Sequence, residues 1–172
     1  MFTTDPGKHW KAWGEIDPYF GVLTSDEYHA DRLGPAAKQA FFESGEQQIE
    51  AAYATVRAHV DPSFAPTRAL DFGCGVGRLT LPLARRCTEA VGVDIAPAML
   101  KEAQVNAAHA GVTNVQWLES DDTLSRVTGR FQFIYSTIVF HHIRPEVGYG
   151  LLNRLLGLLD PGGVLAVQIL YK

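Results

Sequence analysis

The segment Ala69–Thr80, ALDFGCGVGRLT, constrains the fold of this chain more than any other feature. An apolar stretch leads into the acid Asp71, and glycines then alternate at Gly73, Gly75 and Gly77 before a helix-like sequence begins. Glycine allows a backbone turn with positive φ and lets a ligand approach where a Cβ atom would clash. We therefore predict a strand, a tight turn and a helix start, at the edge of a parallel sheet where nucleotide-like ligands bind.

The glycine spacing differs from that of motifs that cradle phosphate. The sequence reads G-x-G-x-G, whereas dinucleotide sites carry G-x-G-x-x-G and P-loops carry G-x-x-x-x-G-K-[ST]. A carboxylate at Asp71, just ahead of the turn, would also repel a pyrophosphate. The turn therefore favours a ligand with amino groups and a positive charge, and a purely structural strand–helix turn is the alternative.

Four further strand-like stretches come after the turn. Ala90–Asp94 ends in an acid 17 residues after Gly77, near the spacing expected of a carboxylate that binds ribose hydroxyls. Pro97 then opens a helix, a position that suits proline. The other three stretches are Val115–Leu118 followed by acids, Phe131–Ser136, and Val164–Val167 after a Pro-Gly-Gly turn. Strands that alternate with helices in this way predict an α/β fold with a parallel sheet.

Together these stretches resemble the class I S-adenosylmethionine-dependent methyltransferases. The resemblance rests on LDFGCGVGRLT, VGVDIAPAML, VQWLESDD, FQFIYSTIVFHHI and LDPGGVLAV, which follow the family's order and spacing between Arg68 and Leu170. It implies a Rossmann-like, doubly wound, mostly parallel sheet of five strands in the order 3-2-1-4-5. It also implies an N-terminal helical lid in residues 1–66, a cofactor-binding core in residues 67–172, and S-adenosylmethionine as the cofactor, with S-adenosylhomocysteine as its product.

The resemblance also implies which residues bind the donor. Asp71 and the backbone from Gly73 to Gly77, with Cys74 and Gly75 in the turn, would bracket the methionine part. Asp94 would accept hydrogen bonds from both ribose hydroxyls. The remaining candidates are Ile95, Met99, Asp121 and Asp122 for the adenine, with Arg78 and Ser136 beside the donor.

Each of these roles has a structural alternative. Asp94 could simply cap the following helix. The adenine candidates could be a solvated pair of acids and ordinary core residues. Cys74 is interpreted as a small packing residue of the turn, and Arg78 could serve the helix start or the surface.

His141 and His142 form a pair of titratable groups near the expected site of methyl transfer. A histidine that titrates near neutral pH can deprotonate an oxygen or nitrogen acceptor, so this pair is our candidate for the catalytic base. Alternatively, both are structural residues at the end of the fourth strand, where neighbouring side chains point to opposite faces. Because no third ligand is evident, the sequence predicts no metal site.

Residues 1–66 precede the motifs and would fold over the cofactor as a lid, as in the enzymes that the chain resembles. We predict an ordered aromatic loop over residues 1–23, a short helix opened by the capping box Thr24–Glu27, and a helix from Pro35 that could restart at Ser44. Aromatic rings of the lid would attract a sulfonium through cation–π interactions, or they could fill the core between lid and sheet. These rings belong to Tyr19, Phe20, Phe41 and Phe42.

Composition narrows the class of partner. The net charge of −4 argues against strong nonspecific binding to nucleic acid, which depends on Lys and Arg. No apolar run approaches the roughly 18 residues of a membrane span, and the first residues lack a signal-peptide pattern. The two cysteines form no disulfide framework, so we expect a cytoplasmic protein.

The end of the chain predicts a second feature. Similar methyltransferases usually add two strands after the Pro-Gly-Gly strand, whereas this chain ends at Lys172. We therefore expect the strand at Val164–Leu170 to have an exposed edge. A long apolar edge invites pairing with another chain, which predicts a homodimer through this fifth strand.

The sequence thus predicts an S-adenosylmethionine-dependent methyltransferase that transfers a methyl group to a small-molecule acceptor by in-line displacement. It does not identify the acceptor. The chain lacks an Asn/Asp-Pro-Pro-Tyr/Phe run after the fourth strand, a run that resembles what amino-methylating enzymes of nucleic acids carry. One alternative is a cofactor-binding module without its own catalysis, favoured by the missing strands. Another is a nicotinamide enzyme, disfavoured by the glycine spacing.

Overall fold

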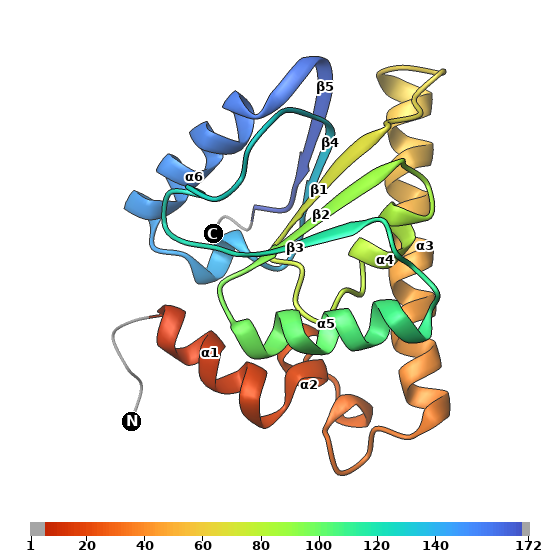
Figure 1. Ribbon diagram of the computed structural model, residues 1–172, viewed down its shortest axis with the longest axis vertical. Helices are drawn as coiled ribbons and strands as arrows, with labels where there is room; N and C mark the ends of the chain where they lie inside the picture. The colour runs from red at the N-terminus through yellow and green to blue at the C-terminus, as the bar shows by residue number, and fades with distance from the viewer. Residues whose placement is uncertain (1–5, 170–172) are drawn as a thin grey trace.

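The protein folds around a parallel five-stranded sheet in the order β3-β2-β1-β4-β5 (Figure 1). The structure is a computed structural model that describes residues 6–169. The predicted fold class and strand order are confirmed. The strands are β1 (Arg68–Phe72), β2 (Glu89–Asp94), β3 (Val115–Glu119), β4 (Phe131–Ser136) and β5 (Leu159–Val167).

Helices cover both faces of the sheet. The helices are α1 (Pro6–Ile16), α2 (Pro18–Val22), α3 (Pro35–His59), α4 (Thr80–Ala84), α5 (Pro97–His109) and α6 (Pro145–Gly157), with 3-10 turns η1 (Asp26–Tyr28) and η2 (Phe140–His142). Figure 1 shows α6 and α3 on opposite sides of the sheet. Leu151 and Leu155 of α6 pack on one face, and Ile49 and Tyr53 of α3 pack on the other.

The N-terminal segment is helical, so the predicted aromatic loop over residues 1–23 is wrong within the described residues. Pro6 and Pro18 each begin a helix. Proline suits a first helical turn because its fixed φ is helical and its missing N–H has no intrahelical partner there. These prolines therefore mark helix starts. Residues 1–5, where the sequence lacks a signal-peptide pattern, lie outside the described residues.

The capping box and the restart of the third helix are also wrong. The helix predicted after Thr24 is only the 3-10 turn η1. The Ser25 hydroxyl donates to the Glu27 carboxylate at 2.6 Å and makes no cap bond to a backbone N–H. Helix α3 runs without a break through Ser44 and Gly45. A Cβ atom on Gly45 would lie 2.2 Å from the carbonyl oxygen of Arg78, so this glycine lets α3 approach the turn between β1 and α4 closely.

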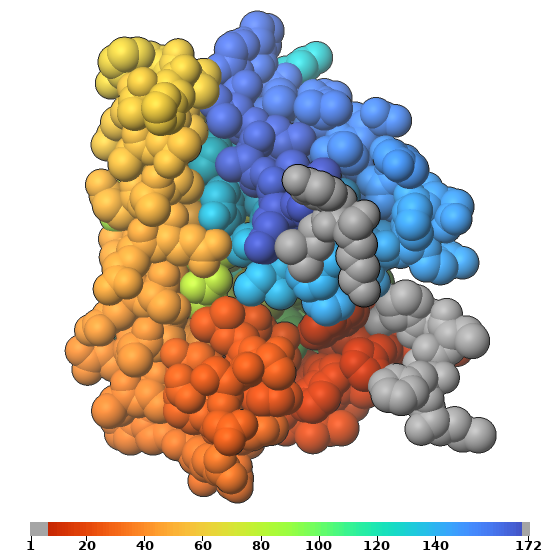
Figure 2. Space-filling model, turned by 180° about the vertical axis from the view of Figure 1, so that it is seen from behind, coloured from red at the N-terminus to blue at the C-terminus, as the bar shows by residue number. Residues whose placement is uncertain are grey.

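Strand β5 forms one edge of the sheet. Within the described residues it pairs with β4 alone, and the register shifts between Phe131 and Phe133 where the Pro-Gly-Gly sequence lies. The predicted turn is therefore part of the strand. Figure 2 shows β5 at the surface beside the column of α3. Leu170, the predicted strand end, lies outside the described residues, and pairing of this edge with a second chain stays a prediction.

Two further sequence expectations concern the whole chain. Among residues 6–169, no helix is both long and apolar enough to span a bilayer. The division into a lid of residues 1–66 and a core of residues 67–172 stays a prediction.

Candidate functional site

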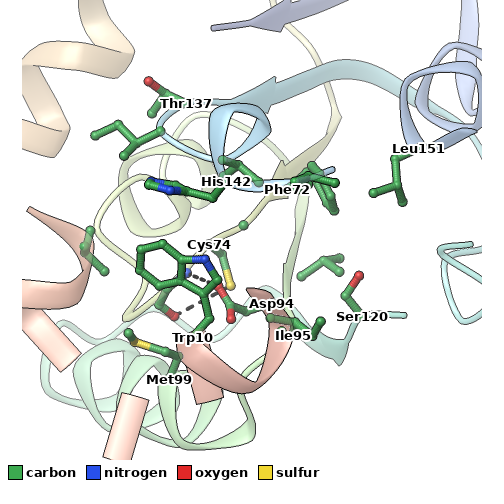
Figure 3. Close-up of a pocket in the computed structure, with 18 of the residues that line it drawn as sticks. Trp10, Phe72, Cys74, Asp94, Ile95, Met99, Ser120, Thr137, His142 and Leu151 are labelled. Carbon is green, nitrogen blue, oxygen red and sulfur yellow. Dashed lines mark hydrogen bonds between the residues drawn. The ribbon is translucent and has the colours of Figure 1, made fainter. Parts of the chain in front are cut away.

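A cavity of about 210 Å³ opens at the carboxyl ends of the strands. Its walls come from the turn after β1, from the ends of β2, β3 and β4, and from α1, α2 and α6. Figure 3 shows Thr137 and His142 on one side, and Asp94, Ile95 and Met99 on the other. In open α/β sheets ligands bind at this edge.

The glycine turn has the predicted left-handed backbone. Gly73, Gly75 and Gly77 have φ values of +79°, +52° and +89°. A Cβ atom on Gly73 would lie 2.2 Å from Cγ2 of Val139, and one on Gly75 would lie 2.5 Å from Cγ2 of Val22. Side chains from the loop after β4 and from α2 therefore close directly onto the turn. Gly73 and Gly75 line the cavity, whereas a Cβ atom on Gly77 would face the ring of Trp117 at 3.2 Å.

The carboxylate of Asp94 is fixed at the cavity wall by two backbone donors. Its Oδ2 atom accepts from the N–H of Gly75 at 2.8 Å, and its Oδ1 atom accepts from the N–H of Ala96 at 2.9 Å. Burial raises the pKa of Asp94, and the backbone bonds oppose this rise. A carboxylate has about four lone-pair positions, so two donors leave room for hydroxyl donors of a ligand. Ala96 is itself the N-cap residue of α5, and this helix has no side-chain cap bond, so the cap role of Asp94 is wrong. The ribose-binding role stays a prediction.

Asp71 lies behind the glycine turn and not on the cavity wall. Its side chain is buried, and its Oδ2 atom accepts from the Thr80 hydroxyl at 2.6 Å. Burial raises the pKa of Asp71 to about 7. The structure thus places this acid where it supports α4 and the turn, and a direct contact with the methionine part is an expectation that the geometry does not favour.

Of the adenine candidates, Ile95 and Met99 lie on the cavity wall. Met99 is also core, since it packs beneath α1 and α2 close to Gly14 and Gly21. The cavity and core interpretations therefore hold together for this residue.

The acids after β3 differ from each other. Asp121 lines the cavity, but its carboxylate accepts from the backbone N–H groups of Thr123 and Ser125 at 2.8 and 3.1 Å and from both of their hydroxyls. These bonds lower the pKa of Asp121. Its oxygens are occupied by the turn, which leaves Asp122 and Ser120 as the polar groups on this part of the wall. Ser120 was not among the predicted site residues.

Arg78 is buried and reaches the cavity from the helix side. Its Nη1 atom donates to the Ser44 hydroxyl at 3.2 Å, and its Nη2 atom donates to Oε1 of Gln48 at 2.7 Å. Its Nε atom has no hydrogen-bond partner among the described residues. Arg78 therefore links the cavity wall to α3, so the alternative of a surface role is wrong.

Two further candidates are structural in their contacts. The Ser136 hydroxyl donates to the carbonyl of Phe72 at 2.8 Å, which joins β4 to β1 behind the cavity wall. Cys74 lines the cavity, and burial raises the pKa of its thiol far above the usual range. A thiol that stays protonated is a packing group and a poor nucleophile.

The histidine pair lies in the 3-10 turn η2, and not at the end of β4 as its structural alternative supposed. His142 lines the cavity, while His141 is exposed and does not. Burial, and then the neighbouring His141 and His9, lower the pKa of His142. His142 is therefore neutral near pH 7 and able to accept a proton.

Trp10 of α1 closes the cavity against His142. The two ring centroids are 4.7 Å apart in an edge-on arrangement, and Figure 3 shows the indole beneath the imidazole. Trp10 was not among the predicted site residues. The start of α1 at Pro6 was the signal that could have placed this ring on a helix.

The aromatic residues predicted to face the sulfonium lie elsewhere. Phe41 is fully buried, and the Tyr19 hydroxyl lies 2.6 Å from the carboxylate of Glu102 on α5. These rings pack with Phe42 between the lid and α5, so the core interpretation holds. Gly21 and Val22 of α2 line the cavity instead.

The loop after β4 is strained where it borders the cavity. Ile138 has a φ of +60°, a region that β-branched residues strongly avoid. Such a residue stores on the order of 1–3 kcal/mol of strain. Within residues 6–169, no group of three or more His, Cys, Asp or Glu side chains is arranged to hold a metal ion.

A family model described as a methyltransferase domain matches residues 69–163, which contain the glycine turn and four strand ends of the cavity. The chain belongs to the class I S-adenosylmethionine-dependent methyltransferases. This confirms the family that the motifs resemble.

Curated relatives share the same segment. An uncharacterized methyltransferase of Mycobacterium tuberculosis is 39% identical over 99 residues, which are 57% of this chain and 48% of that protein. A ubiquinone biosynthesis O-methyltransferase of Cereibacter sphaeroides is 32% identical over 109 residues, which are 63% of this chain and 43% of that protein. The chain thus spans less than half the length of these two relatives.

Solved structures share the fold. Magnesium protoporphyrin IX methyltransferase of Synechocystis, with S-adenosylmethionine bound, superposes with a TM-score of 0.64 and 21% identity over 93% of this chain and 74% of that one. Phosphoethanolamine N-methyltransferase 1 of Haemonchus contortus superposes with a TM-score of 0.72 and 13% identity over 94% of this chain and 31% of that one. At these identities the likeness concerns the fold alone.

Proposed function

We propose that the cavity binds S-adenosylmethionine and that the protein transfers the donor's methyl group to a small-molecule acceptor. The observation that carries this proposal is the Asp94 carboxylate, which the N–H groups of Gly75 and Ala96 hold at the cavity wall. A carboxylate in this place suits two ribose hydroxyls. The glycine turn beside it admits a ligand close to its backbone.

The donor's other parts are placed relative to this anchor. The methionine part would lie along Gly73 and Gly75, and the adenine would lie against Ile95 and Met99. Ser120 and Asp122 are available to the adenine amino group, because the oxygens of Asp121 are occupied by its own turn.

Methyl transfer requires the protein to place the acceptor in line with the methyl carbon. Correct placement can contribute roughly 7–11 kcal/mol to lowering the barrier. The donor supplies the reactive methyl group, and the protein binds and orients. His142 is the proposed base: it lines the cavity, and its lowered pKa keeps the imidazole neutral and ready to take a proton from an oxygen or nitrogen acceptor. His141 lies outside the cavity and acts on His142 through its charge.

The acceptor class rests on charge and on the relatives. A net charge of −4 does not suit a polyanionic substrate. Two similar proteins have names that refer to small molecules: one is a ubiquinone biosynthesis O-methyltransferase, and the other is a phosphoethanolamine N-methyltransferase. We therefore propose a small-molecule acceptor.

Two further proposals concern the whole protein. The described cysteines, Cys74 and Cys87, are free thiols, which fits a reducing cytoplasm. Strand β5 exposes an edge within the described residues, and pairing of two such edges would give a homodimer. Light scattering across a concentration series tests the dimer, and a monomer at every concentration contradicts it.

Calorimetry followed by an acceptor screen tests the function. We expect S-adenosylhomocysteine to bind and NAD to give no heat, because the turn lacks a phosphate cradle. A screen of small-molecule acceptors with labelled S-adenosylmethionine then tests transfer. Binding without transfer to any acceptor would indicate a cofactor-binding module, and absence of binding would overturn the proposal.

Paired histidine variants test the base. With an acceptor identified, His142→Phe should lower turnover by roughly 100-fold or more while S-adenosylhomocysteine still binds, since general bases contribute effects of this size. His141→Phe should lower it by much less. Equal losses would contradict the assignment of the base to His142.

A further inference from the structure

A strained residue forms part of the cavity wall. Ile138 has a left-handed φ of +60°, and it lines the cavity together with its neighbours Thr137 and Val139. For a β-branched residue this backbone conformation is a genuine outlier. Strain of this kind persists only where the surrounding structure enforces it, and it is concentrated at functional sites.

Gln168, just past the end of β5, enforces the strained conformation. Its Oε1 atom accepts from the N–H of Ile138 at 2.9 Å and from the Thr137 hydroxyl at 2.7 Å. The N–H of Gln168 in turn donates to the carbonyl of Ser136 at 2.9 Å, which fixes the glutamine against the end of β4. Three hydrogen bonds from one residue thus hold the chain on both sides of the peptide that is strained.

The strained turn sets the path of the next residues. Val139 packs over the glycine turn, so closely that a Cβ atom on Gly73 would lie 2.2 Å from its Cγ2 atom. The residues after Val139 form η2, which carries His142 to its place against Trp10. If Ile138 relaxed to a negative φ, the chain direction would change and both Val139 and His142 would leave these positions.

We propose that Gln168 is a positioning residue of the ligand site. Its amide oxygen holds Thr137 and Ile138 in the left-handed turn, and the turn fixes Val139 over Gly73 and His142 on the cavity wall. Gln168 is exposed and is not part of the cavity wall, so it acts through the loop and touches no ligand. The identity of the ligand rests on the proposed function, whereas the action of Gln168 on the loop does not.

Substitutions at position 168 separate hydrogen bonding from bulk. Gln168→Leu removes the acceptor, and Gln168→Glu keeps an oxygen that can accept both bonds. We expect Gln168→Leu to weaken S-adenosylhomocysteine binding by about tenfold and to speed deuterium exchange of the Ile138 amide by at least about tenfold, the size expected from losing hydrogen bonds. Gln168→Glu should stay close to the wild type in both. Gln47→Leu, at an exposed glutamine of α3, is the matched control and should change neither.

A second substitution tests whether strain is the cause. Glycine adopts a positive φ without steric penalty. In the Gln168→Leu background, Ile138→Gly should therefore restore S-adenosylhomocysteine affinity to that of Ile138→Gly alone, while the amide at position 138 still exchanges fast. A general loss of stability would not be rescued in this way.

The outcomes distinguish this inference from the proposed function. Unchanged affinity and unchanged exchange in Gln168→Leu overturn the inference, and so does a Gln168→Glu variant that behaves like Gln168→Leu. If the wild type does not bind S-adenosylhomocysteine, the proposed function fails, and exchange at Ile138 alone decides on the action of Gln168. Should Gln168→Leu fail to fold, Gln168→Asn takes its place, because its shorter side chain withdraws the amide oxygen from the loop.

Discussion

The two turns that meet across the cavity both contain left-handed residues, but they stabilise this conformation differently. In the turn after β1 the left-handed residues are glycines, among them Gly73 with a φ of +79°. In the turn after β4 the left-handed residue is Ile138, and a side chain 30 positions downstream, Gln168, holds it. The first conformation is inexpensive and encoded locally. The second is strained and depends on a contact between distant parts of the chain, so it is the more sensitive to change.

The largest effect is expected where the two turns touch. Gly73→Ala combines a left-handed alanine with a clash against Val139, and we expect it to lower the free energy of unfolding by about 4 kcal/mol. Gly162→Ala is a matched control, because Gly162 has the same φ of +79° with open space around its missing Cβ. Gly162→Ala should lose only about 1 kcal/mol, from the left-handed conformation of alanine alone. Urea unfolding measures both.

The difference between these two glycine variants isolates the contact between the turns. Equal losses would mean that Val139 moves aside without penalty, and the loop after β4 would then be softer than its hydrogen bonds to Gln168 indicate. In that case the proposed action of Gln168 would also be weakened.

The next effect concerns the acids on the β2 and β3 side. Asp94→Ala should weaken S-adenosylhomocysteine binding by about 1.5–3 kcal/mol, the range for hydrogen bonds to a charged group. Asp121→Ala should weaken it much less, since the Asp121 carboxylate is already bonded to the turn at Thr123 and Ser125. Calorimetry decides, and unchanged affinity in Asp94→Ala would exclude the ribose assignment.

The contrast between the two turns also separates the features that the sequence predicts from those that it does not. Features encoded by local patterns were predictable, and features that depend on contacts between distant residues were not. The glycine turn and the place of Asp94 were predictable, because alternating glycines and an acid at a strand end are local patterns. The strand order followed from the resemblance of several such stretches, in their order along the chain, to a known family. The position of His142 on the cavity wall was predictable in the same way, from its place after the fourth strand.

The rest depends on contacts that no local pattern encodes. Nothing in the sequence around Ile138 indicates a left-handed residue, because the cause is the side chain of Gln168. From the sequence, Asp121 resembles a ligand-binding acid. In the structure its carboxylate already accepts hydrogen bonds from the hydroxyls of Thr123 and Ser125. Trp10 lies on the cavity wall because α1 begins at Pro6, and the sequence around Trp10 was predicted to be a loop.

The buried acid behind the glycine turn, Asp71, should make the free energy of unfolding depend on pH. Burial raises the pKa of Asp71 from 3.8 to about 7, so between about pH 4 and pH 7 the folded protein holds a proton that the unfolded chain has released. This contribution to stability is present below pH 4 and is lost as the pH rises to 7, with a steepest slope of about 1.4 kcal/mol per pH unit.

Asp71→Asn removes that contribution. Relative to the wild type, the variant should gain stability steadily from pH 4 to pH 7 in urea unfolding, and the difference should level off above pH 7. If the difference in unfolding free energy between the variant and the wild type is constant across this range, Asp71 is already ionised in the folded protein. The glycine turn then packs against a charged carboxylate.

The smallest expected effect is the difference in stability between alanine and glycine variants, which should have opposite signs at an ordinary helical position and at Ile138. In helix α5, at the exposed Gln104, substitution by Ala should leave the protein more stable than substitution by Gly by about 1 kcal/mol, as helix propensities require. At position 138 we expect the reverse, with Ile138→Gly more stable than Ile138→Ala by about 1 kcal/mol, because alanine is disfavoured in the left-handed region and glycine is not. Both pairs lose their original side chain, so each Gly–Ala comparison removes the effect of lost contacts. If alanine is the more stable residue at both positions, Ile138 relaxes when it is truncated, and the turn after β4 is not held against strain.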